Sequence, residues 1–151
     1  MKPKTLPALS CVLSEKTIKQ LQDDLKKKNV TDLSGHLEKL FGYKEIFNLH
    51  ADHLRELAEY IIDLVSDDDP VAYAKRTGAY IKKEKQKYHR EQAKTVRMYQ
   101  WAKQMEGEDS VHVLDLEYRC SVYRQGFAYS RFHAYILMER LARFVIEGAR
   151  S

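Results

Sequence analysis

The sequence predicts an all-α fold in which a small N-terminal cluster of three short helices packs on a long antiparallel helical hairpin. Three observations lead to this prediction. Two long stretches, 69–106 and 110–148, are divided only by the tight Gly107-Glu108-Asp109 break. Apolar residues in the first half recur at helical spacing, and all three prolines lie at or before position 70.

The three short helices are each indicated by an apolar stripe and by residues that favour helix ends. Ser14 is a capping residue in front of the Ile18, Leu21 and Leu25 stripe, and this helix should end near Asn29. A second helix should follow Thr31 or Asp32 and stop at Gly42. A third is expected over 51–65, with apolar residues recurring from Leu54 to Val65.

The first arm of the hairpin should begin at Asp69-Pro70, because Asp caps free N–H groups and Pro fits the first helical position. Thirty-seven helical residues would span about 55 Å, longer than a compact domain of this size is wide. We therefore expect the middle of this helix to project from the body or to be covered thinly.

The second arm, 110–148, is apolar on two faces. One face carries Leu116, Cys120, Phe127, Leu137 and Leu141, among others. The opposite face is the predicted interface of a homodimer, and its residues are Leu114, Tyr118, Val122, Tyr129, Phe132 and Ile136. A strand is the local alternative for 114–122, where apolar and polar residues alternate.

Length and composition favour one globular domain, 1–151, with an N-terminal arm at 1–13, the short-helix cluster at 14–66 and the hairpin at 69–106 and 110–148. No apolar run approaches the ~20 residues that span a bilayer. The N-terminal residues do not resemble a cleaved leader, so we expect a cytoplasmic protein without a membrane partner. Cys11 and Cys120 fit neither a disulfide framework nor a metal motif.

Positive charge is concentrated in the first arm. Between Lys82 and Lys94 six basic residues stand against two acidic ones, an excess of +4 that equals the formal net charge of the chain. A surface of this kind attracts the phosphates of DNA or RNA, although many charged helix faces are merely solvated. The predicted nucleic-acid-binding residues are Lys82, Lys83, Lys85, Lys87, Arg90, Lys94 and Arg97, joined by Arg124 and Arg131 from the second arm. In a hairpin that is antiparallel about Glu108, position 88 falls near position 128, so Tyr88 should lie close to Arg124 and Arg131 within one positive surface.

A helix-turn-helix reader of DNA is not indicated. The connection from Gly42 to His50 is too long for its turn, and the third helix is acidic, with Asp52, Glu56 and Glu59 on it.

Metal binding and catalysis have weaker support. His50, His53 and Glu56 share part of one helical face and offer ligands that zinc or iron accepts, but His50 is also placed to cap its helix. No nucleophile elbow or phosphate-binding glycine loop is present. We therefore predict no cofactor, metal or catalytic residue, and a small metal-dependent enzyme ranks last among the functions considered.

The leading hypothesis is a non-catalytic, self-associating helical protein that presents the basic face 82–97 to nucleic acid. The alternative is a protein–protein adaptor or inhibitor that docks a partner helix on the apolar face 114–136. The two differ in their response to salt, because phosphate contacts weaken steeply with ionic strength and apolar docking does not.

Overall fold

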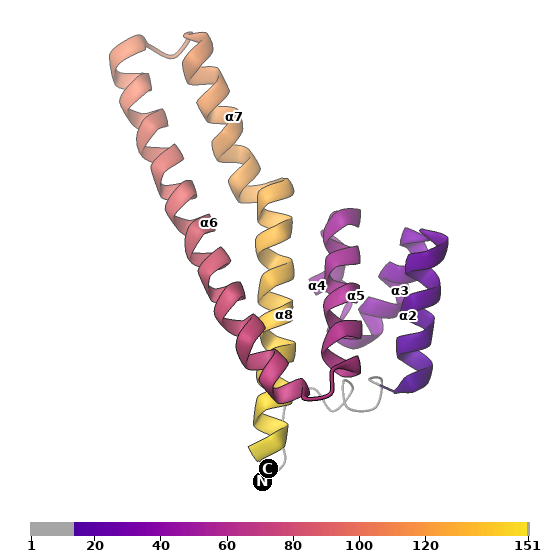
Figure 1. Ribbon diagram of the computed structural model, residues 1–151. Helices are drawn as coiled ribbons and strands as arrows, with labels where there is room; N and C mark the ends of the chain where they lie inside the picture. The colour runs from indigo at the N-terminus through magenta and orange to yellow at the C-terminus, as the bar shows by residue number, and fades with distance from the viewer. Residues whose placement is uncertain (1–13, 151) are drawn as a thin grey trace.

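The computed structural model describes residues 14–150, with side chains up to residue 148, and every element in that part of the chain is an α-helix. The short helices lie together on one side, and a long two-helix arm projects beyond them (Figure 1). The predicted fold class is therefore confirmed. The helices are α2 (Glu15–Lys27), α3 (Val30–Phe41), α4 (Tyr43–Ile46), α5 (Ala51–Ser66), α6 (Pro70–Glu106), α7 (Val111–Gln125) and α8 (Phe127–Arg150). The predicted N-terminal arm and Cys11 lie outside the described residues.

The first helices begin and end where local hydrogen bonds allow. The Ser14 side chain accepts from the backbone N–H of Thr17, and Lys28 ends α2 in the left-handed region at φ 56°. Asn29 then caps α3 by accepting from the N–H of Asp32, so this helix starts slightly earlier than predicted. The short helix α4, which the sequence did not predict, occupies part of the expected loop before α5.

The main core joins α2, α3, α4, α5 and α8 to the first half of α6, and α8 packs against both α5 and α6. Leu57 and Ile61 on α5 and Leu137 and Leu141 on α8 belong to this core, and all four side chains are fully buried. Burying one such side chain contributes roughly 1.5–3 kcal/mol. The short-helix cluster is thus held against the base of the hairpin, as the sequence predicted, and the rest of the hairpin lies outside this core.

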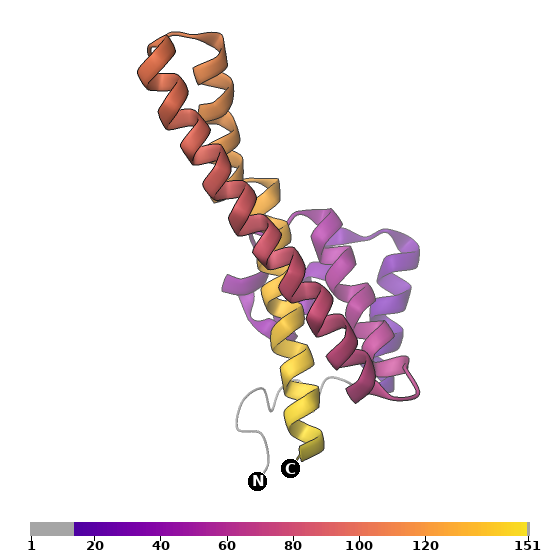
Figure 2. The same cartoon turned by 60° about the vertical axis from the view of Figure 1, so that its left-hand side comes forward.

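Helix α6 is the longest element, with 37 residues from Pro70 to Glu106. It begins as predicted: the Asp69 side chain accepts from the N–H of Ala72, and Pro70 follows at the first helical position. Its distal half runs beside α7 and away from the cluster in both views (Figures 1 and 2). A second, small core of Ala102, Val113 and Leu116, packed against Tyr99, holds the two helices together there.

The second arm is not one helix, contrary to the sequence prediction of a single stretch over 110–148. The helix stops at Gln125 and restarts at Phe127, and Gly126 between them has an extended backbone. A Cβ atom added at Gly126 would lie 3.0 Å from the Cα atom of Val122, so the backbone would have to shift by a few tenths of an ångström to accept a side chain. The strand alternative for 114–122 is also wrong, because these residues belong to α7.

We predict that Gly126→Ala destabilises the protein by about 1–3 kcal/mol, because the new methyl group must displace backbone rather than a flexible side chain. Thermal and urea unfolding followed by circular dichroism measures the change. The matched control is Gly35→Ala inside α3, where nothing lies within 4 Å of the added atom; it should raise stability by up to about 1 kcal/mol. Equal stabilisation by both substitutions would contradict a steric origin of the break.

Candidate nucleic-acid interface

Five of the predicted basic residues form one line along the outer side of α6. They are spaced by four, three, four and three residues, which keeps their side chains on one helical face. All five are exposed, and none pairs with an acidic side chain among the described residues. We call this line the basic stripe; it extends over about 21 Å of helix and consists of Lys83, Lys87, Arg90, Lys94 and Arg97.

The acidic residues of the same segment lie on the flank of the basic stripe. Glu84 and Glu91 are seven residues apart, so they share a face, and both line a hollow of about 180 Å³ between α6 and the α7–α8 junction. Lys87 of the basic stripe lines the same hollow, three residues after Glu84 and four before Glu91. The two carboxylates therefore offset part of the positive charge on this flank, whereas Lys83, Arg90 and Arg97 lie farther round the helix.

Tyr88 fixes the position of α6 against the second arm. Its ring stacks on Phe132 with centroids 4.3 Å apart, and its hydroxyl donates to the carbonyl oxygen of Tyr123. Burial raises the pKa of Tyr88, so the hydroxyl keeps its proton and remains a donor at neutral pH. The contacts match the antiparallel register expected from the sequence, in which position 88 falls near position 128.

Two predicted phosphate ligands are instead engaged within the protein. Lys85 is half-buried and pairs with Glu139 on α8, with Nζ 3.0 Å from the carboxylate oxygen. Arg131 donates from Nε and Nη2 to the hydroxyl of Tyr135, at 3.1 and 2.9 Å. Arg131 also faces the carboxylates of Glu56 and Glu84, so it does not join the basic stripe in the single positive surface that the sequence suggested.

The remaining two predicted basic residues are exposed. Lys82 lies on the flank of α6, about 100° from the neighbouring Lys83. Arg124 is in the last turn of α7, where its Nε donates weakly to the carbonyl oxygen of Cys120 at 3.4 Å. Both can turn their charged groups to a ligand without breaking an ion pair.

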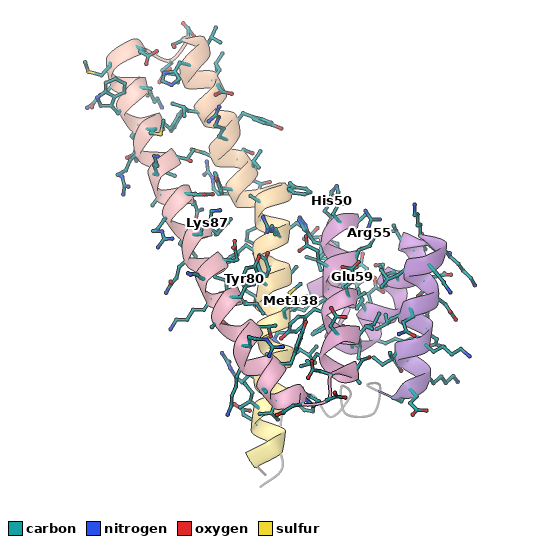
Figure 3. All side chains as sticks on the ribbon, viewed as in Figure 1. His50, Arg55, Glu59, Tyr80, Lys87 and Met138 are labelled. Atoms are coloured by element: carbon teal, nitrogen blue, oxygen red, sulfur yellow. The ribbon has the colours of Figure 1, made fainter. Side chains whose placement is uncertain are left out.

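A second hollow, of about 280 Å³, lies between α5 and α6 over α8 and was not foreseen from the sequence. Tyr80, Met138 and Glu59 come from the three helices around it (Figure 3). Burial raises the pKa of Glu56, and it raises the pKa of Tyr135 to about 12 although Arg131 donates to that hydroxyl. No sequence motif marks this hollow, because its residues are brought together only by the packing of α5, α6 and α8.

The candidate metal ligands serve the packing of α5. His50 caps the helix, its Nδ1 accepting from the N–H of Asp52 at 3.1 Å. Nδ1 of His53, which is 1% exposed, lies 2.7 Å from Oγ of Ser130 on α8, and the same hydroxyl accepts from the backbone N–H of His50. Glu56 lines the second hollow instead. Across residues 14–148, no group of three or more His, Cys, Asp or Glu side chains is arranged to hold a metal ion.

The predicted dimer face is divided by the break at Gly126. Leu114, Tyr118 and Tyr129 are exposed, at 54%, 69% and 41%. Phe132, however, stacks on Tyr88 inside the hairpin, and Val122 and Ile136 are half-buried. The six residues therefore do not form one continuous exposed surface, and the exposed apolar side chains gather toward the end of the arm.

Comparisons with protein-family models, with curated proteins and with solved structures found no match for this chain. Among the described residues, no helix is both long and apolar enough to span a membrane.

We predict that acidification destabilises the fold through His53. Burial lowers the pKa of His53, with further lowering from His50 and Arg131, so the unfolded chain binds a proton more readily than the native protein. The contribution of this residue is complete above pH 6.5 and is lost as the pH falls toward the lower native value. His53→Gln should reduce the fall in thermal midpoint between pH 7 and pH 5.

The control for this experiment is His89→Gln, which replaces an exposed histidine on α6. It should leave the pH dependence of the thermal midpoint close to that of the wild type. If His53→Gln leaves the pH dependence equally unchanged, protonation of His53 does not limit the acid stability of the protein.

Proposed function

We propose that this protein is a non-catalytic nucleic-acid-binding protein that contacts phosphates through the basic stripe on α6. The observation that carries the proposal is the arrangement of five exposed, unpaired basic side chains on one helical face, with Glu84 and Glu91 only on its flank beside Lys87. Such a line attracts polyanions strongly. Among the described residues no base-reading element accompanies it, so binding is expected to depend little on nucleotide sequence.

The projecting shape of the arm supports the same proposal. A helix held to the body at only one end offers a long exposed face to an extended ligand (Figure 2). Lys82 and Arg124 flank the stripe and can add further phosphate contacts. Lys85 and Arg131 do not belong to the proposed surface, because both have partners within the protein.

A second candidate function is that of a protein–protein adaptor or inhibitor. It is favoured by Val111, Leu114 and Tyr118, which follow one face of α7 and are 84%, 54% and 69% exposed. Val113, Leu116 and Cys120 follow the opposite face and are buried, so the outer residues contribute nothing to the core of the arm. An amphipathic helix of another protein is the kind of partner that such a strip accepts.

Self-association and a cytoplasmic location are further parts of the proposal. Surplus apolar surface on the arm supports the first, as it did in the sequence, although the surface differs from the one predicted there. The location rests on the sequence alone.

We predict that binding to a duplex DNA weakens steeply with salt. If the five side chains of the stripe each neutralise one phosphate, log K should fall with log salt with a slope of about −4.5. The triple variant Lys87→Gln, Arg90→Gln and Lys94→Gln should reduce the steepness by about 2.7, and a single-stranded RNA should give a shallower slope throughout. Fluorescence anisotropy of labelled oligonucleotides between 50 and 200 mM salt, chosen as about the range in which such contacts respond, measures both effects.

The matched control removes three positive charges from the short-helix cluster by Lys16→Gln, Lys19→Gln and Lys44→Gln. It changes the net charge equally and should leave the slope unaltered. Equal loss of binding in the two triple variants would show a general effect of net charge and would contradict a defined surface on α6. An interaction insensitive to salt would favour the adaptor function instead.

A further inference from the structure

The outer face of α6 has an ordered charge pattern that continues beyond the basic stripe. After Arg97 the same side of the helix carries Met98, Trp101 and Met105, spaced by three and four residues and 42%, 58% and 68% exposed. The helix then ends at Glu106, and the turn contains Glu108 and Asp109. From the base of the arm toward its tip, this face is basic and then apolar, and the turn beyond it is acidic.

The apolar part of this face has no role in the folding of the arm. The core that joins α6 to α7 consists of Ala102, Val113 and Leu116 with Tyr99, and it lies on another side of α6. Trp101 is the only tryptophan of the chain and is more than half exposed. Large exposed apolar side chains grouped on one face usually mark a contact surface.

The charges at the two ends of the pattern are nearly balanced. Residues 104–118 contain five acidic side chains and no Lys or Arg, whereas residues 82–97 contain seven basic and two acidic ones. The net charges of the two segments are therefore −5 and +5. Three of the five acidic residues lie at the tip of the arm, so two copies that run in opposite directions bring opposite charges together.

We propose that two copies of this chain pair arm against arm, antiparallel, about a two-fold axis near Trp101. The apolar residues of the two copies meet at the axis, and the acidic turn of each copy lies beside the basic stripe of the other. With the axis at Trp101, position 94 of one copy is level with position 108 of its partner, and position 97 is level with position 105. Because the two copies are related by a two-fold axis, every such contact occurs twice in this isologous interface.

The apolar patch can form the centre of such an interface. Each large aromatic side chain buries about 150–250 Å² when it is covered, and a standard interface takes about 800 Å² from each partner. The exposed parts of Trp101, Met98 and Met105 supply part of that area on each copy, and the apolar stems of the neighbouring Arg and Lys side chains extend it. Charge then sets the antiparallel direction, because a parallel pair would place like charges side by side.

The existing partners of the acidic turn offer little competition. Glu108 lies 3.6 Å from Nζ of Lys103, and Glu106 lies 2.8 Å from Nδ1 of His112, both at the exposed end of the arm. Exposed pairs of this kind contribute about 0–1 kcal/mol. Asp109 has no ion pair among the described residues. The carboxylates can therefore turn to a second copy at small cost.

Pairing of this kind also has a regulatory consequence, which rests on the proposed function. The acidic turn of one copy covers basic residues that the other copy would offer to phosphates, so self-association and nucleic-acid binding compete. A polyanion should shift the protein from dimer to monomer, and the dimer should hold fewer phosphates per chain than the monomer.

Sedimentation equilibrium of the full chain at micromolar concentrations and low salt tests the pairing. The wild type should show twice the 17.7 kDa mass of the chain. Two double variants reverse the charges. The stripe variant combines Arg90→Glu with Lys94→Glu, and the turn variant combines Glu108→Lys with Asp109→Lys. Each should weaken the dimer at least about tenfold, because each reversal acts at two symmetric contacts. An equimolar mixture of the two variants should recover a heterodimer, since each then supplies the charge the other lacks.

Two further variants identify the surface. Trp101→Ser should abolish the dimer with unchanged helix content, because the side chain belongs to neither core. The control Lys16→Glu and Lys19→Glu on α2 should leave the dimer intact. A monomeric wild type would overturn the proposal. The proposal would also be overturned if the dimer survived all the α6 and turn variants but was lost in the double variant Leu114→Lys, Tyr118→Lys. That result would assign the contact to the outer face of α7.

The outcome is independent of the nucleic-acid experiment. The turn variant keeps the basic stripe intact, so it should bind oligonucleotides at least as well as the wild type if the proposed function holds. A charge-dependent dimer without nucleic-acid binding would refute the proposed function alone. Nucleic-acid binding by a monomeric wild type would refute the pairing alone.

Discussion

Burial of α8 between α5 and α6 is the interaction on which the other features of this structure depend. Leu137 and Leu141 are fully enclosed, and the same helix holds Ser130 against the buried His53 of α5. These contacts fix the base of the hairpin to the short-helix cluster. Because the packing ends near the α7–α8 junction, the distal arm keeps only its own small core. The arm is therefore stable enough to form and too thin to bury all of its apolar side chains.

The packing of α6 on one side also determines where its charged side chains lie. An α-helix that packs on one side only must expose the others, and the spacing of the basic residues directs five of them to the outer side of α6. Glu84 and Glu91 turn toward the hollow beside Tyr88. Lys85 is close in sequence to the basic stripe, and Arg131 is on the opposite arm of the hairpin. Both are engaged within the protein instead, Lys85 by Glu139 and Arg131 by Tyr135. The basic residues that are clustered in the sequence therefore form a narrow line on the outer side of α6.

The sequence was a reliable guide to elements with strong local signals. Capping by Ser14 and Asp69 marked two helix starts, because a side-chain oxygen and a free N–H group only a few residues apart need no tertiary contact to meet. The break at Gly126 was missed for the opposite reason. A lone glycine inside a helical pattern is usually tolerated, and only the extended backbone of Gly126 in the folded chain shows that this one ends a helix. The division of the predicted dimer face follows directly from that break.

By itself, the sequence determined the helical class, the cap of α6, the antiparallel register that brings position 88 near position 128, and the concentration of positive charge in one segment. These properties depend on spacing along the chain. Only the tertiary structure decided which basic side chains remain free, and it alone assembled the hollow around Tyr135. It also decided that Trp101 stays exposed while Phe132 is stacked. Such outcomes depend on which helix covers which face, and that is settled by packing between residues far apart in the chain.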